Sequence, residues 1–209
     1  TFANPQPATL PPYNVETHAH SGAQVVQTLA AIQKAERPVF LLGSQSVLNP
    51  SQCAELSRLV EQTQIPVFLS GMARGLLPPE HSALFRHKRK VALRQADLVL
   101  LAGVPNDFRL DYGSQISSKT VLISVNRNKR DLYLNRKPTI PVLADPAAFL
   151  IDLSKKIVQT APKWETWTRT LQANEAARET EIAEQSQDPG SKEKGINPFA
   201  SCLPTLIQF

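Results

Sequence analysis

The sequence of 209 residues predicts an α/β fold in which a doubly wound parallel sheet is covered by helices on both faces. The run from Leu98 to Ala102, LVLLA, has no polar face, so it fits a strand that is buried on both sides. Similar apolar runs alternate with helical patterns, which indicates βαβ units with right-handed crossovers. Gly103 ends the run before a loop, and in such sheets ligands bind beyond the carboxyl ends of the strands. The expected fold is therefore Rossmann-like.

Four helices are expected within the domain. The first, Ser21–Glu36, carries an apolar stripe, has Ser21 as its N-cap and ends before Pro38. The second begins near Ser51, which is also a candidate cap, and presents Leu56, Leu59 and Val60 on its apolar side. A short third helix, Lys90–Ala96, leads into the LVLLA run. The fourth begins at Asp145-Pro146, with Asp as the cap and Pro in the first turn, and runs through Ile157.

Five strands are expected, and each is a short apolar run between helix or turn signals. Pro66 stands at the start of its run, where a missing N–H is tolerated, and Pro141 indicates that the last strand lies at an edge of the sheet. The expected strands are Val39–Gly43, Ile65–Leu69, Leu98–Ala102, Thr120–Val125 and Thr139–Leu143.

The composition divides the chain further. Residues 1–20 are rich in proline and are expected to be an inter-domain linker, followed by a domain over residues 21–160. Residues 161–186 are expected to form a largely exposed helix that Trp164 and Trp167 anchor to the domain or to a missing partner. Residues 187–209 are expected to contain a linker and the truncated start of a further domain.

Charge, cysteine content and hydropathy argue against several classes of protein. The net charge of +5 comes largely from Arg86–Lys90 with Arg94 and from basic residues between Arg127 and Lys137. No nucleic-acid-binding motif accompanies these clusters, so we expect solvated surface or contact with a phosphate-bearing ligand or domain partner rather than nucleic acid. The two cysteines form no C-x-x-C, no metal site is expected, and no apolar run approaches the ~20 residues of a membrane helix.

The motifs of the common enzyme classes are absent. The first strand is followed by G-S-Q-S-V rather than G-x-G-x-x-G, and the second ends at Ser70 without an acid for a ribose. There is also no G-x-S-x-G elbow, no P-loop and no H-E-x-x-H motif. We therefore expect this domain to supply binding surface and no catalytic residue.

The order and spacing of several segments resemble the central domain of thiamine diphosphate-dependent enzymes, a DHS-like NAD/FAD-binding type. The closest resemblance is to the acetolactate synthase-like branch, of the 2-hydroxyacyl-CoA lyase type. The segments that carry it are Arg37-Pro38 with Gly43, MARGLLP (Met72–Pro78), LRQADLVLLAG (Leu93–Gly103), Asp107–Leu110 and VNRN (Val125–Asn128).

The resemblance implies a parent protein that needs thiamine diphosphate and Mg²⁺. Family members bind these through two further domains, one with a catalytic Glu and one with a G-D-G…N motif. This sequence has no G-D-G, and Ile196-Asn197-Pro198 resembles the start of the third domain, so we expect a piece that is not catalytic alone. The resemblance also implies a homo-oligomeric parent at the endoplasmic reticulum membrane.

In relatives the central domain binds FAD or ADP at the carboxyl ends of its strands. By resemblance the candidate site here comprises Gly43, Gly103, Arg109 and Asn126, with phosphates near Gly43 and Arg109 and the ribose near Asn126. Relatives often carry Gly-x-Arg where this chain has Gly103-Val104-Pro105, and an Asp where it has Asn126. Both losses weaken anion or ribose contacts, so any nucleotide site here is expected to be weak or lost. ADP or the nucleotide of CoA stays an open candidate ligand, and FAD is not expected.

Two alternatives remain open from the sequence. The domain could be purely structural, a dimer-interface domain without a ligand, in which case Arg109 would pair with Asp107 or Asp111 to hold its loop. An independent Rossmann-type enzyme is the least expected alternative.

Overall fold

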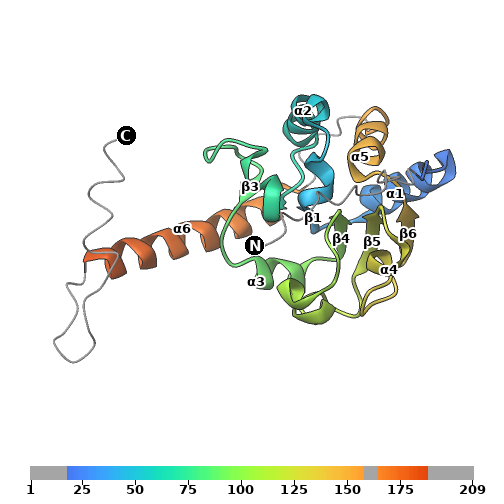
Figure 1. The fold of residues 1–209 in the computed structure, drawn as a ribbon. Helices are drawn as coiled ribbons and strands as arrows, with labels where there is room; N and C mark the ends of the chain where they lie inside the picture. The colour runs from blue at the N-terminus through green and yellow to red at the C-terminus, as the bar shows by residue number, and fades with distance from the viewer. Residues whose placement is uncertain (1–17, 158–163, 188–209) are drawn as a thin grey trace, which may run out of the picture.

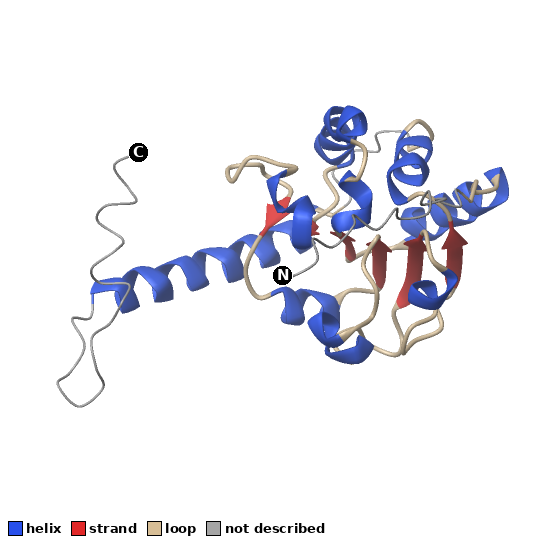
Figure 2. Cartoon of the chain, viewed as in Figure 1, coloured by secondary structure: helices blue, strands red, loops and turns tan. Residues whose placement is uncertain are grey.

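A computed structural model describes residues 18–157 and 164–187 and contains one six-stranded, all-parallel sheet (Figure 1). Helices lie on both sides of the strands (Figure 2), so the expected doubly wound α/β class is confirmed. Most of the expected linker over residues 1–20 and the expected start of a further domain after residue 187 lie outside the described residues.

The strand order is β3-β2-β1-β4-β5-β6. This is the order of the dinucleotide-binding fold, with the topological switch point between β1 and β4. Five strands were expected, and β3 is the one that was missed. The strands are β1 (Pro38–Leu42), β2 (Val67–Leu69), β3 (Leu84–Phe85), β4 (Leu98–Ala102), β5 (Val121–Asn126) and β6 (Ile140–Leu143). As Pro141 indicated, β6 forms an edge of the sheet.

Local capping explains where the helices begin. Ser21 forms a capping box with Gln24, and the side chain of Asp145 accepts a hydrogen bond from the Ala148 N–H at 3.0 Å. The expectation for Ser51 was wrong, because Asn49 Oδ1 accepts from the Ser51 N–H and a 3₁₀ turn, η2 (Pro50–Gln52), precedes the helix. The helices are α1 (Gly22–Lys34), α2 (Cys53–Thr63), α3 (Arg89–Gln95), α4 (Lys129–Leu132), α5 (Pro146–Ser154) and α6 (Glu165–Gln187).

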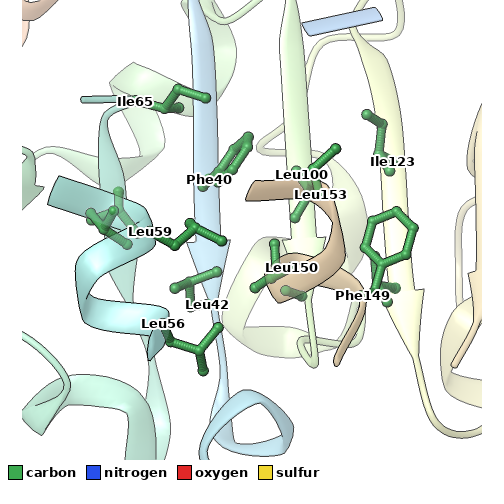
Figure 3. Packing of buried hydrophobic residues seen from close by; sticks show 14 of the residues in the cluster. Phe40, Leu42, Leu56, Leu59, Ile65, Leu100, Ile123, Phe149, Leu150 and Leu153 are labelled. Carbon is green, nitrogen blue, oxygen red and sulfur yellow. The ribbon is translucent and has the colours of Figure 1, made fainter. Parts of the chain in front are cut away.

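The sheet separates two apolar layers. On one face, Phe40, Leu100 and Ile123 are register partners in β1, β4 and β5 (Figure 3), and they pack in one cluster with side chains from α1, α2 and α5. On the other face, alternate residues of the same strands pack against α3 and the start of α6. All five residues of β4 are buried, which explains its lack of a polar face.

Tryptophans anchor α6 to the domain, as expected from the sequence. Trp164 Nε1 donates to the carbonyl oxygen of Ala35 at 3.0 Å, and Trp167 Nε1 donates to that of Pro38 at 3.1 Å. Leu171, one turn further on, is also buried. Glu175, Glu179 and Glu181 then contact the residues after β3. The C-terminal end of the helix extends away from the sheet (Figure 2). Among the described residues no helix is long and apolar enough to cross a membrane.

Replacing the central core residue tests this arrangement. Leu100 is fully buried in the middle of the sheet, so Leu100→Ala should lower the free energy of unfolding by about 2–5 kcal/mol through the cavity that it leaves. Val26→Ala is the control, because Val26 is 57% exposed on α1 and such surface changes usually stay within about 0.5 kcal/mol. Denaturant titration measures both, and equal small effects would contradict the burial of β4.

Candidate functional site at the carboxyl ends of β1, β4 and β5

The loops after β1 and β4 meet directly at the switch point. The Gly43 N–H donates to the carbonyl oxygen of Ala102 at 2.8 Å, and the Gly103 N–H donates to that of Val125 at 2.8 Å. Each loop therefore begins as an extension of the sheet, and the two chains leave the sheet side by side.

Glycine is required at both positions for different reasons. A Cβ on Gly43 would lie 2.4 Å from the carbonyl oxygen of Gly103 and 2.5 Å from a methyl of Val104. Gly103 has a φ of +67°, and a Cβ there would lie 2.6 Å from the Cβ of Gln45. A side chain at Gly43 would hold the two loops apart, whereas one at Gly103 would be both strained and blocked.

Gln45 closes the crevice between these loops, a role that the sequence did not reveal. Its Nε2 donates to Asn126 Oδ1 at 3.0 Å, and its Oε1 accepts from the Arg127 N–H at 3.0 Å. Gln45 belongs to the 3₁₀ turn η1 (Ser44–Val47) that follows β1, whereas its partners lie at the end of β5. The side chain thus crosses the end of β4, the strand between them.

Asn126 is fully buried beneath this bridge. Its Oδ1 accepts from Gln45 Nε2 and from the Asn128 N–H at 3.2 Å. Its Nδ2 has no hydrogen-bond partner among the described residues. A buried, unsatisfied donor costs about 1–3 kcal/mol, so the Asn126 Nδ2 lowers the stability of the site.

Arg109 is held by Asp107, the first of the two partners expected for it. Arg109 Nε lies 3.1 Å and its Nη2 2.5 Å from Asp107 Oδ2, and Asp107 also accepts from the Arg109 N–H. The hydrogen bonds from Arg109 lower the pKa of the Asp107 carboxyl, and Asp107 in turn raises the pKa of the guanidinium. The Arg109 side chain is 44% exposed, so this pair adds little to stability.

Three of the four expected site residues share one small pocket. Gly43, Gly103 and Arg109 line a hollow of about 180 Å³, but Asn126 is not among its lining residues. Pockets for small organic ligands usually measure ~300–1,000 Å³. The hollow at the switch point is therefore smaller than the usual range.

One group of described residues has the spacing of a metal site, namely His87 with Glu175 and Glu179 of α6. Glu179 Oε1 is already 2.7 Å from a guanidinium nitrogen of Arg86 and 2.9 Å from His87 Nε2. Glu175 accepts from the N–H groups of Arg86 and His87 at 3.0 and 2.9 Å. These bonds fasten α6 to the segment before α3, and they already engage both carboxylates within the protein.

The fold defines a doubly wound α/β domain with the strand order of dinucleotide-binding proteins. Comparison with known proteins gives its family. The family described as "Thiamine pyrophosphate enzyme, central domain" matches residues 25–153. The chain belongs to this family, so the expected resemblance is confirmed.

Individual relatives within this family have the following degrees of similarity to the chain. The chain is 36% identical to 2-hydroxyacyl-CoA lyase 2 of Danio rerio over 85% of its own length, and 34% identical to that of Homo sapiens over 95%. It is 39% identical to the acetolactate synthase large subunit IlvG of Mycobacterium tuberculosis over 51% of its length. These alignments cover 29%, 30% and 19% of the respective relatives, so the chain spans less than a third of their length.

The close approach of the loops after β1 and β4 can be tested with a pair of glycines. Gly103→Ala should lower the free energy of unfolding by about 1–3 kcal/mol, because alanine is strained at positive φ and its Cβ meets Gln45. Gly75→Ala is the matched control, since its Cβ would meet nothing within 4 Å. It should leave stability unchanged or raise it by up to about 1 kcal/mol. Equal effects of the two substitutions in thermal unfolding would contradict this close approach.

Proposed function

We propose that this chain is the central, non-catalytic scaffold domain of a thiamine diphosphate- and Mg²⁺-dependent enzyme of the 2-hydroxyacyl-CoA lyase or acetolactate synthase-like type. The observation that carries the proposal is the alignment with 2-hydroxyacyl-CoA lyase 2, which extends over 85–95% of this chain but only 29–30% of the relatives. In this proposal the remaining domains hold the thiamine diphosphate, the Mg²⁺ and the reacting groups.

The geometry of the switch point supports a scaffold in preference to a nucleotide-binding module there. Gln45 already forms hydrogen bonds with Asn126 Oδ1 and with the Arg127 N–H, the groups that a ribose would use. Asp107 likewise already binds the guanidinium of Arg109. A nucleotide would have to break both sets of hydrogen bonds, and it would form a contact with only one guanidinium, that of Arg109. We therefore propose that ADP, CoA nucleotide and FAD do not occupy this crevice.

The scaffold proposal predicts what surrounds this domain in its gene. Reading the gene in both directions should reveal an upstream domain with a catalytic Glu and a downstream G-D-G…N segment. Expression of that full frame should give cleavage of a 2-hydroxyacyl-CoA that depends on thiamine diphosphate and Mg²⁺, whereas the 209-residue chain alone, as the control, should give none. Turnover by the chain alone, or a gene without a G-D-G segment, would refute the proposal.

Titration with ADP distinguishes the scaffold proposal from the alternative that this crevice binds a nucleotide. Because Asp107 already binds Arg109, Arg109→Ala should leave the calorimetric response to millimolar ADP unchanged relative to the original chain. If Arg109 instead held a phosphate, the substitution would remove a charge-assisted contact of about 1.5–3 kcal/mol and weaken ADP roughly tenfold or more. That weakening, if Arg74→Gln did not share it, would assign ADP to the site at Gly43, Gly103 and Arg109.

A further inference from the structure

A larger hollow, of about 520 Å³, lies at the carboxyl ends of β2 and β3. Phe68 and Phe85 are register partners in these strands and line it with rings whose centroids are 6.1 Å apart. Leu77, also buried, adds to the apolar lining. This volume falls within the ~300–1,000 Å³ of small-molecule pockets, and the lining shares no residue with the smaller hollow at the switch point.

Four cations surround this apolar lining, and two of them are already neutralised. Arg86 forms ion pairs with Glu175 and Glu179 at 3.4 and 2.7 Å. Lys90 lies 3.8 Å from Asp111. These two side chains already have acidic partners, with which an anionic ligand would have to compete.

Arg74 and Arg89 are the remaining two, and neither forms an ion pair within the part of the chain that the structure describes. Arg89 is half-buried, and its guanidinium donates to a carbonyl oxygen, that of Arg109, at 2.8 Å. Burial and the nearby charges of Arg74 and Arg109 lower the pKa of Arg89. An anion between Arg74 and Arg89 would relieve this repulsion and gain bidentate hydrogen bonds.

The pocket also contains an unused acceptor. Gln115 lines it, and the side-chain Oε1 of this residue is buried without a hydrogen-bond partner among the described residues. A hydroxyl or N–H on a ligand that reached this atom would satisfy it. Buried polar atoms are rarely left unpaired, so this is a second observation that points to a ligand.

We propose that this pocket binds an organic anion that carries a phosphate group on an apolar body. Arg74 and Arg89 hold the phosphate, and the apolar body lies against Phe68, Phe85 and Leu77. The inference stands on this pocket alone and does not require the proposed scaffold function.

Calorimetry with three probes tests the pocket: inorganic pyrophosphate, n-octyl phosphate and ADP. The folded 209-residue chain should bind at least one of the organic phosphates roughly tenfold or more tightly than pyrophosphate, because the apolar lining adds to the charge contact. Tighter binding of octyl phosphate would assign an aliphatic body, and tighter binding of ADP an aromatic one.

Arg74→Gln is the decisive variant, because Arg74 is exposed and its loss should not disturb folding. It should weaken the organic phosphate roughly tenfold or more, as expected for a lost charge-assisted bond. Arg58→Gln, which removes an exposed cation from α2, is the matched control and should have no effect. No heat with any probe, or an equal loss in both variants, would overturn the proposal.

Discussion

The structure depends on one continuous row of apolar register partners that crosses all six strands on one face of the sheet. The row consists of Leu84, Val67, Phe40, Leu100, Ile123 and Ile140. Because all strands are parallel, each connection must cross a face of the sheet. The row is covered by α2, which lies in such a connection, together with α1 before β1 and α5 after β6. The same constraint brings every strand's carboxyl end to one edge, where the loops after β1 and β4 compete for space. The glycine pair Gly43 and Gly103 is a consequence of that crowding.

Features encoded by neighbouring residues were predictable from the sequence. The LVLLA run and the caps at Ser21 and Asp145 each rest on a short segment, and the structure agrees with all three. β3 was missed because two residues are too few to show any periodicity, and only the pairing of Leu84 with Val67 makes them a strand. The helix start near Ser51 was misplaced because Asn49, two residues earlier, is an equally good cap.

The candidate site also contains residues that a short segment predicts and residues that only the folded chain reveals. Gly43 and Gly103 could be found because a glycine after a buried strand has a local meaning. Gln45 could not be found, because its partners Asn126 and Arg127 lie 81 and 82 residues further along the chain. Nothing near Gln45 in the sequence distinguishes it from a surface glutamine. Its role depends on the strand order, in which β4 lies between β1 and β5 and the Gln45 side chain bridges the two outer strands.

The basic segment before α3 looks uniform in the sequence, but the fold gives its cations different tasks. Arg86 and Lys88 pair with Glu175, Glu179 and Glu181 of α6, whereas Arg89 faces Arg74 without an acid among the described residues. Arg86 also borders the Arg74–Arg89 pocket. Release of α6 would therefore leave another unpaired charge beside two that already repel each other. Docking of this helix and the charge of the pocket are thus physically linked, because the same guanidinium contributes to both.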